Sequence, residues 1–396
     1  MKVLINAVSA KSGGAATYIE NLIRSLADAD SRHSYIFLVP PQSAKTSHVD
    51  SENVEVRETT IGLGAAWKRF LWDQLTIRHL VRKEHVDVIV SSSDFGTLWP
   101  PCPQILMLRN ALFFCPLYKE HILMRHSWKR RTAHALRKVL VKFSAKFSAR
   151  VVVASQAMLR DVQKEIHLPE DRVKVNPFGV PSTRFDMRAF KEWEVGNGSK
   201  GNVFRMLYVA EYGDYKNFAV LFQAIKILSQ RGITDILLVT TTNPWQAPGV
   251  QSTTRECDQI LARDPGVAPF LKDVGYIPYS GIPALYASSD LVLFPSLSES
   301  FGHPLVEAMA SERAIIAAET AINREICREA ACYFQPFDAE GLAQQIDTLR
   351  KDSTLRARLA LAGRRRAQRY FNWDDYVTRL TRMIEDVTRE VKYARR

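Results

Sequence analysis

The stretch Ser298-Glu-Ser-Phe-Gly-His-Pro-Leu-Val-Glu-Ala-Met-Ala310 follows a short apolar run, Leu291-Val-Leu-Phe294. The apolar run predicts a buried strand, and the residues after it predict a tight loop and then a helix. Pro304 suits the first helical position, because its fixed φ and its missing N–H cost nothing there. Glu299 then lies just before the helix and Glu307 lies on its first turn, so that one carboxylate stands on each side of the helix start.

This loop has the chemical features of a nucleotide-sugar site. Free backbone N–H groups at a helix start bind phosphate, and carboxylates accept hydrogen bonds from hydroxyl groups. Phosphates and hydroxyls on one ligand indicate a nucleotide sugar. The simpler alternative is that the helix dipole alone favours each glutamate, by about 0.3–1 kcal/mol.

The length of 396 residues predicts two domains of nearly 200 residues each. Hydrophobic residues make up 46% of the chain, but no apolar run approaches the ~18–20 residues that a membrane span needs. The N-terminal ten residues are expected to form a first strand rather than a signal peptide, because Asn6 interrupts their apolar run. The five cysteines form no CxxC pair and no His-Cys metal pattern, which favours reduced thiols in the cytoplasm.

The net charge of +12 predicts anionic partners. Nucleic acid, anionic lipid and sugar diphosphates all qualify on charge alone. A nucleic-acid-binding protein would show aromatic residues interleaved with Lys and Arg, or a recognisable reader motif, and neither is evident. Nucleic acid is therefore not the expected partner.

Strand-like and helix-like segments alternate along both halves of the chain, which predicts an α/β fold of two doubly wound domains with mostly parallel sheets. The strands expected in the first half are 2–6, 35–39, 54–56, 86–90, 104–108 and 150–154. Those expected in the second half are 206–209, 236–239, 291–294 and 314–318. The predicted boundaries are a first domain over 1–183, a polar linker over 184–202, a second domain over 203–372 and a terminal helical segment over 373–396.

Two further loops each follow the first predicted strand of a domain. Gly13 and Gly14 come after the first strand of domain one, where glycines let the backbone approach a ligand. Their loop lacks the G-x-G-x-x-G spacing of a dinucleotide site, and a plain turn stays the alternative. Lys216 stands in the loop after the first strand of domain two, where a cation can neutralise a diphosphate leaving group. A solvated lysine at a helix start is the alternative there.

The spacing Glu299-x7-Glu307, with Phe301, Gly302 and Pro304 between, resembles the motif of retaining glycosyltransferases of the GT-B fold, above all family 4. Other similar segments are Lys216-Asn217, Phe178-Gly179-Val180, Met309-Ala-Ser-Glu-Arg-Ala-Ile-Ile316 and Asn323-Arg-Glu325. The resemblance covers most of domain two and is looser in domain one. It implies two Rossmann-like domains with an interdomain cleft, and a terminal helix that crosses back to the first domain.

The resemblance also implies roles for single residues. Glu299 would contact hydroxyls of the donor sugar, and Glu307 would hold those of the ribose. The amides around Phe301 and Gly302 would serve the sugar and the phosphate. Four more residues are expected to line the donor: Gly13, Gly14, Lys216 and Asn217.

Three positions depart from the family pattern. Glu211 stands roughly where members carry an Arg, so either Lys216 acts with backbone amides or another cation replaces that Arg. Many members carry a His after a strand of domain one, where this chain has Arg109 and Asn110. Asn110 is a candidate catalytic residue because its amide bonds hydroxyls, and Arg109 is a candidate for the missing phosphate cation. A Gly is usual at the place of Glu312, in the turn after the helix, where the change affects local conformation.

The segment 129–147 predicts an amphipathic basic helix. Leu136 and Phe143 recur at helical spacing with Leu140 between them, while Lys138, Lys142 and Lys146 recur on another side. Such a helix suits an anionic membrane surface. The alternative is a half-buried helix with a solvated basic face.

Metal ligands and cofactors are not expected. The nine histidines show no metal-ligand spacing, and the D-x-D of Asp28 and Asp30 closes a helix among loop residues. Together with the resemblance, these observations predict a metal-independent, retaining transferase of the hexosyltransferase type, with Glu299, Lys216 and Asn110 as catalytic residues.

The resemblance implies transfer from a nucleoside diphosphate sugar to a saccharide or lipid-linked saccharide, in the assembly of a surface polysaccharide such as lipopolysaccharide. The protein would be cytoplasmic and peripheral on the inner face of the plasma membrane. Three alternatives stay open: a GT-B sugar-nucleotide epimerase, a basic nucleic-acid-binding protein, and an inactive scaffold.

Overall fold

The computed structural model describes residues 1–11, 13–29, 32–41, 51–64, 66–181, 185, 203–242 and 253–394. The chain forms two compact units. Unit 1 consists of Met1–Phe114, Ser127–Pro177 and Asp374–Arg396, and unit 2 consists of Cys115–His126 and Phe178–Trp373. The stretch 184–202, predicted as a linker, lies outside the described residues except for Phe185.

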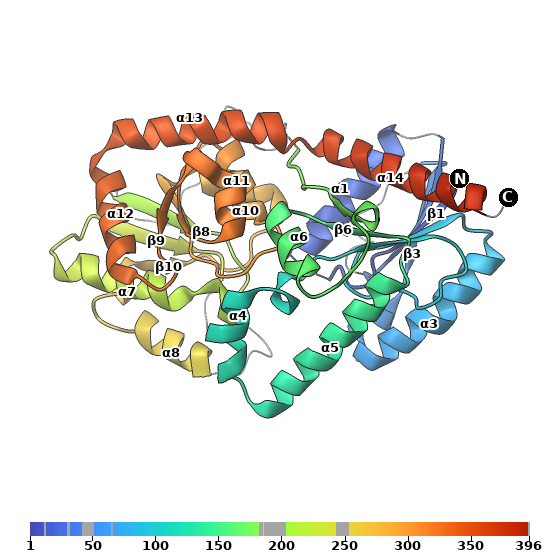
Figure 1. Ribbon diagram of the computed structural model, residues 1–396. Helices are drawn as coiled ribbons and strands as arrows, with labels where there is room; N and C mark the ends of the chain where they lie inside the picture. Colours follow the sequence, from blue (N-terminus) through green and yellow to red (C-terminus); the bar gives the residue numbers. More distant parts are fainter. Residues whose placement is uncertain are drawn as a thin grey trace. The chain divides into compact units, whose positions relative to one another are not determined.

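Unit 1 contains a seven-stranded sheet of order β3-β2-β1-β4-β5-β6-β7, in which every neighbouring pair is parallel (Figure 1). Its strands are β1 (Lys2–Asn6), β2 (Ser34–Val39), β3 (Val54–Glu58), β4 (Val88–Ser91), β5 (Gln104–Met107), β6 (Arg150–Val153) and β7 (Val173–Val175). The central strands are near-continuous apolar runs because both faces of the sheet are covered.

Helices cover both faces of this sheet. α5 (Trp128–Lys146) and α6 (Gln156–Gln163) pack against strand residues such as Leu106, and α3 (Ala66–Lys83) packs against strand residues such as Leu4 on the same face. Tyr18 of α1 (Gly13–Ala29) contacts Met107, the neighbour of Leu106, and therefore lies on the opposite face. Tyr18 also shares a 2.7 Å hydrogen bond with Tyr376 of α14 (Trp373–Ala394), so α14 packs on unit 1 beside α1 (Figure 1).

Unit 2 repeats this plan with a six-stranded parallel sheet of order β10-β9-β8-β11-β12-β13. Its strands are β8 (Phe204–Tyr208), β9 (Ile236–Thr240), β10 (Leu271–Asp273), β11 (Leu291–Phe294), β12 (Ala314–Ala318) and β13 (Cys332–Phe334). The helices are α7 (Phe218–Gln230), α8 (Thr253–Ala262), α9 (Ile282–Ala287), α10 (His303–Ala310), α11 (Ala321–Cys327), α12 (Ala339–Lys351) and α13 (Ser353–Tyr370), with α4 (Pro116–His121) from the first half of the chain.

The structure contains every strand that the sequence predicted and three more. β7, β10 and β13 were not predicted, and each lies at an edge of its sheet with only three residues. Strands so short and partly exposed carry no readable alternation of apolar and polar residues. The α/β class and the doubly wound topology are confirmed.

In each sheet the strand order reverses between two central neighbours. The reversal lies between β1 and β4 in unit 1 and between β8 and β11 in unit 2. In open α/β sheets, ligands bind outside the carboxyl ends of the strands at such a switch point. Each unit therefore offers one place where loops diverge and a ligand can enter.

Candidate functional site

The loops after β8 and β11 bring a lysine and a glutamate together at the switch point of unit 2. Lys216 ends the turn η7 (Asp214–Lys216), and its Nζ lies 2.6 Å from Oε1 of Glu299. Both side chains are mostly buried, at 11% and 15% exposure. Burial is the largest single effect on Lys216 and lowers the pKa of its ammonium, but the Glu299 carboxylate, together with Tyr215 and Tyr208, raises that pKa above its ordinary value. The pair is therefore a charged contact, and it lies at the edge where open α/β sheets in general bind ligands.

Two hydrogen bonds to backbone carbonyls hold these loops in place. The Tyr208 hydroxyl at the end of β8 donates to the carbonyl of Lys216 at 2.9 Å. The Leu297 amide donates to the carbonyl of Tyr215, also at 2.9 Å. The loop that carries Lys216 is thus held both by the end of β8 and by the loop after β11.

Asn217, predicted beside the donor phosphates, supports the loop through its side chain. Its backbone is left-handed, with φ of 55°, a conformation that asparagine tolerates. Its Nδ2 donates to the carbonyls of Pro295 and Pro336, at 3.4 and 3.2 Å. These bonds join the loop after β8 to the loops after β11 and β13.

The start of α10 differs in register from the prediction. Gly302 precedes the helix with φ of 85°, a left-handed conformation that favours glycine. His303 is the first helical residue, so the prediction that Pro304 holds the first position is wrong by one residue. Glu307 consequently falls on the second turn rather than the first.

Glu307 is a buried carboxyl group, 6% exposed. The Tyr286 hydroxyl donates to its Oε2 at 3.1 Å, and Tyr279 also bonds it. Burial raises the pKa of Glu307 to about 7, against the opposing effect of the two tyrosine hydrogen bonds. Near neutral pH this side chain can therefore either accept or donate a hydrogen bond to a ligand hydroxyl.

The ring of Phe301 belongs to the core of unit 2. It is fully buried and meets the rings of Phe178 and Phe371 edge-on, each at a centroid distance of 5.5 Å. Its side chain is therefore structural, and only its backbone is left to meet a ligand.

Unit 1 holds the other predicted site residues. Gly13 opens α1, and Gly14 is exposed beside it. The guanidinium of Arg109 lies over the ring of Tyr18, 4.3 Å from its centroid. The side-chain oxygen of Asn110 accepts from the amide of Leu112 at 3.1 Å and caps a short turn. These residues follow β1 and β5, whereas Lys216, Glu299 and Glu307 lie together in unit 2.

One segment near the unit 2 loops was missed by sequence reasoning. Residues Cys115–His126 leave the first half of the chain and pack into unit 2. His126 Nε2 lies 3.1 Å from Oδ2 of Asp214, and Cys115 Sγ lies 3.6 Å from the carbonyl of Leu297. No sequence motif predicts these contacts, because each contact joins residues that are far apart in the sequence.

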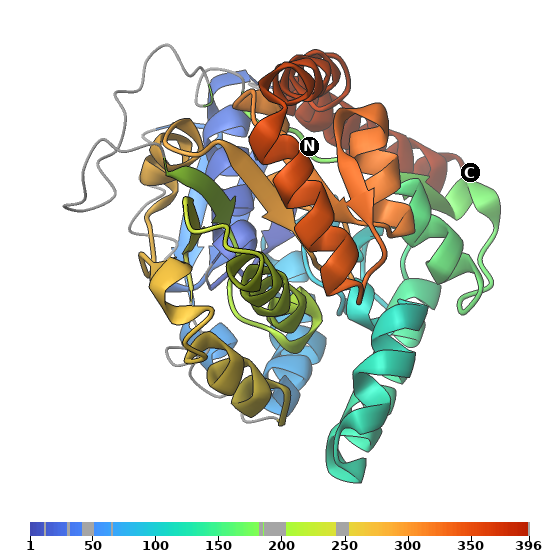
Figure 2. The same ribbon diagram turned by 90° about the vertical axis from the view of Figure 1, so that its left-hand side faces the viewer.

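The predicted basic helix is α5, and two lysines of its predicted basic side are paired with a carboxylate. Lys138 and Lys142 lie 2.7 and 2.8 Å from Glu165, whose pKa they lower to about 2 against the effect of burial. Leu136 and Phe143 are instead 64% and 47% exposed. The exposed cations of the helix are Lys129, Arg130, Arg131, Arg137 and Lys146. Figure 2 shows the first turns of α5 projecting beyond the rest of unit 1.

The described residues contain neither a metal-binding cluster nor a membrane-spanning helix. Within the described ranges, no three His, Cys, Asp or Glu side chains lie close enough to hold a metal ion. Asp28 lies near the end of α1, and Asp30 of the D-x-D is not among the described residues. All five cysteines are free thiols. None of the helices in the described part of the chain is long and apolar enough to cross a membrane.

Two family models match this chain. The family model described as Glycosyl transferases group 1 matches residues 189–366, and that described as Glycosyltransferase Family 4 matches residues 12–184. The MMP alpha-(1->4)-mannosyltransferase of Mycolicibacterium hassiacum is 25% identical over 239 residues, which are 59% of this chain and 53% of that protein. The O-antigen chain mannosyltransferase B of Escherichia coli is 25% identical over 185 residues, 43% of each chain. The chain spans about half the length of the curated relatives it matches.

Solved structures show the fold. Sucrose-phosphate synthase from Thermosynechococcus elongatus superposes with a TM-score of 0.76 at 16% identity, over 98% of this chain and 99% of that one. Anabaena Alr3699/HepE in complex with UDP-glucose superposes with a TM-score of 0.70 at 17% identity, over 98% and 100%. The two family models together reach from residue 12 to residue 366. The chain therefore belongs to glycosyltransferase family 4, with the two parallel-sheet domains of the GT-B fold.

Proposed function

We propose that this protein is a retaining glycosyltransferase that moves a hexose from a nucleoside diphosphate sugar to a saccharide hydroxyl. The observation that carries the proposal is the charged contact between Lys216 and Glu299 at the switch point of unit 2. Glu307 lies on the helix that follows the same loop and is held by tyrosine hydroxyls. One cation and two carboxylates match a ligand that carries both phosphates and hydroxyls.

In the proposed reaction, the bond between the anomeric carbon and the diphosphate oxygen breaks and a bond to the acceptor oxygen forms on the same face. Lys216 offsets the negative charge that develops on the leaving diphosphate. Glu299 orients the sugar through its hydroxyls, and Glu307 holds the ribose. The leaving diphosphate takes the proton of the acceptor hydroxyl, so the reaction needs no separate protein base.

Nucleotide binding provides the first test. A thermal-shift panel of UDP, GDP, ADP, CMP and single-stranded DNA would be run on the wild type and on Glu307→Ala. A ligand at 100 times its Kd adds about 2.7 kcal/mol to stability, which is several degrees for a domain of this size. We expect one diphosphate to stabilise the wild type and not the variant. Stabilisation by DNA alone would contradict the proposal.

Turnover separates transfer from its alternatives. UDP-glucose and GDP-mannose are the donors to offer, since a structural neighbour carries UDP-glucose and two relatives are named mannosyltransferases. We expect release of the nucleoside diphosphate, reduced at least 100-fold in Glu299→Gln. Glu340→Gln, which removes an exposed carboxylate of α12, is the control. An epimerase would return an altered nucleotide sugar, and a scaffold would leave the donor intact.

We also propose that unit 1 contacts an anionic membrane surface through α5, as a lipid-linked acceptor in surface-polysaccharide assembly would require. Trp128, Leu136 and Phe143 are exposed on the same helix as five exposed cations. The protein should sediment with vesicles of phosphatidylglycerol but not of phosphatidylcholine, and Leu136→Glu should abolish the binding. Equal sedimentation with both vesicle types would contradict an electrostatic contact.

A further inference from the structure

A short segment from the first half of the chain contacts three loops at the carboxyl edge of the unit 2 sheet. Residues Cys115–His126 belong to unit 2 and include α4, and we call them the strap. Cys115 contacts the loop after β11, and His126 contacts the loop after β8. The ring of His121 lies 4.7 Å from the ring of Phe337, which follows β13. The strap therefore bears on the loops whose relative positions define the candidate site.

At the loop after β8, the strap holds a mostly buried carboxylate. Nε2 of His126 lies 3.1 Å from Oδ2 of Asp214, and the two side chains are 12% and 9% exposed. A carboxylate that loses its hydration to this extent is costly unless a partner replaces that hydration. His126 supplies a donor at hydrogen-bond distance, and also a positive charge when it is protonated.

A second carboxyl group nearby makes this partner more important. Asp258 of α8 is 2% exposed, and the Tyr212 hydroxyl donates to its Oδ2 at 2.7 Å. Burial raises the pKa of Asp258 to about 7, and the charge of Asp214 adds to this rise against the effect of the Tyr212 hydrogen bond. Asp214 and Asp258 therefore repel each other when both are ionised. Without His126, Asp214 would carry a buried charge that a second carboxylate repels.

Asp214 opens the same short turn that Lys216 closes. The turn η7 has only three residues, and the Lys216 amide donates to the carbonyl of Gly213 at 2.9 Å. Because residues of one 3-10 turn share its tight backbone geometry, a displacement of Asp214 shifts Lys216 as well. The 2.6 Å contact of Lys216 with Glu299 therefore depends on where Asp214 is held.

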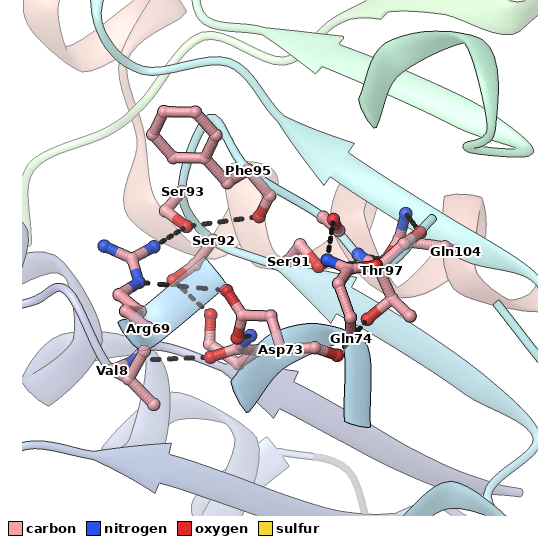
Figure 3. Close-up of polar contacts among 12 residues, drawn as sticks. Val8, Arg69, Asp73, Gln74, Ser91, Ser92, Ser93, Phe95, Thr97 and Gln104 are labelled. Atoms are coloured by element: carbon pink, nitrogen blue, oxygen red, sulfur yellow. Dashed lines mark hydrogen bonds and ion pairs between the residues drawn. The ribbon is translucent and has the colours of Figure 1, made fainter. Parts of the chain in front are cut away.

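Polar contacts from outside also fix the switch point of unit 1. Figure 3 shows Arg69 and Asp73 of α3 beside the residues that follow β4. Nη2 of Arg69 donates to the hydroxyl of Ser93 at 2.7 Å. Nδ2 of Asn6, at the end of β1, donates to Oδ1 of Asp73 at 2.9 Å. A helix thus holds the strand ends of unit 1 as the strap holds the loops of unit 2.

We propose that His126 is a positioning residue that holds Lys216 against Glu299 by pairing with Asp214. The inference rests on the proposed function, in which Lys216 offsets the charge of the leaving diphosphate. That charge develops in the transition state, so the loss of His126 should lower kcat more than it raises the KM of the donor.

Donor turnover in His126→Ala tests this role. We expect kcat to fall about tenfold or more, the cost of a displaced catalytic group, with little change in the KM of the donor. His126→Gln keeps a donor nitrogen near the place of Nε2 and should restore most of kcat. His167→Ala removes an exposed histidine of unit 1, and this matched control should equal the wild type.

A double-mutant cycle shows whether His126 acts through Lys216. In the Lys216→Ala background, His126→Ala should cause no further loss of kcat, because the group that it positions is already gone. An equal loss in both backgrounds would overturn the inference. So would a loss in His126→Gln as large as that in His126→Ala.

Lysine acetylation by acetic anhydride, read by mass spectrometry on the full chain, reports the position of Lys216 without turnover. The side chain is 11% exposed and should react slowly in the wild type. Its labelling should rise severalfold in His126→Ala, but not in His126→Gln or His167→Ala. Lys226, at 40% exposure on α7, is the internal reference and should react equally in every variant. Unchanged labelling of Lys216 in His126→Ala would overturn the inference.

A second variant covers the case in which His126→Ala does not fold. His126→Ala combined with Asp214→Asn removes the contact without leaving the buried charge of Asp214 behind, and the same expectations apply to it.

Labelling and turnover together keep this inference separate from the proposed function. Increased labelling of Lys216 in His126→Ala, with no turnover by the wild type, would retain the positioning role and remove the transferase. Turnover by the wild type with unchanged labelling in the variant would do the reverse.

Discussion

Glu307 in unit 2 and Asp73 in unit 1 are both buried carboxyl groups near a switch point, and burial raises the pKa of both. Their partners differ. Tyr286 and Tyr279 bond Glu307, whereas Asp73 has one firm bond, from Asn6, and a distant Arg69. The contrast shows that burial alone does not define a site. Two tyrosine hydroxyls of the protein bond the first carboxyl group, whereas the second has an oxygen, Oδ2, without a donor among the described residues.

The loop that precedes Glu307 in unit 2 is joined to the core by an aromatic ring. The loop of unit 2 is anchored by Phe301, whose ring meets Phe178 and Phe371. Phe301→Ala should therefore destabilise unit 2 by about 3–5 kcal/mol, the usual cost of removing a buried ring. Urea unfolding measures this loss. Phe337→Ala, at a half-exposed ring of the same unit, is the control and should cost much less. Equal losses in the two variants would show that the loop does not depend on the core.

The two carboxyl groups predict different pH windows. Each has a folded pKa above its ordinary value, so folding takes up a proton and stability falls as pH rises. The contribution of Asp73 is complete below pH 3.8 and is lost as pH rises through about 6. That of Glu307 is complete below pH 4.5 and is lost as pH rises through about 7. Each loss amounts to about 3 kcal/mol at most.

Urea unfolding from pH 4 to pH 8 distinguishes these windows. Relative to Asp73→Asn, the wild type should lose stability mainly below pH 7. Relative to Glu307→Gln, the loss should continue to pH 8. Glu340→Gln controls for the removal of one carboxylate at an exposed place. A difference that stays constant with pH would mean that the carboxyl group is not held away from water as its burial indicates.

Sequence reasoning predicted the parts of unit 2 that rest on local patterns. The apolar runs of β11 and β12 predicted the first and last residues of both strands correctly. The glycine and the proline after β11 predicted the loop that carries Glu299. The contact of Lys216 with Glu299 joins loops 83 residues apart and depends on the switch topology. The two residues were therefore named as candidates without their partnership.

The buried contact of Asp73 was not predicted from the sequence. Arg69 and Asp73 are four residues apart on a helix, a spacing that in sequence indicates an ordinary surface ion pair. What makes the carboxylate unusual is its contact with Asn6, 67 residues earlier, at the end of a central strand. Burial at that depth is a property of how α3 crosses the sheet, and no local pattern in α3 encodes it.

The helices that carry the two carboxyl groups are both followed by a residue with a left-handed backbone. Substitutions at these two residues should have the smallest effects on stability. Glu312 follows α10 with φ of 52°, and His85 follows α3 with φ of 53°, both left-handed. A side chain in this conformation costs about 1–2 kcal/mol, and a glycine loses about 0.5–1 kcal/mol more backbone entropy on folding. His85→Gly should therefore raise the free energy of unfolding by roughly 0.5 kcal/mol, as measured by thermal unfolding. His79→Gly, in the interior of α3, should lose about 1 kcal/mol and is the control.

Glu312→Gly should raise the free energy of unfolding less than His85→Gly does, because it also removes the ion pair with Arg364. An exposed pair of this kind contributes about 0–1 kcal/mol, which is as large as the conformational gain. The two variants thus compare the same backbone change with and without a lost partner. A larger gain at 312 than at 85 would mean that the ion pair opposes the native turn, and that the end of α10 is strained by Arg364 rather than by its φ alone.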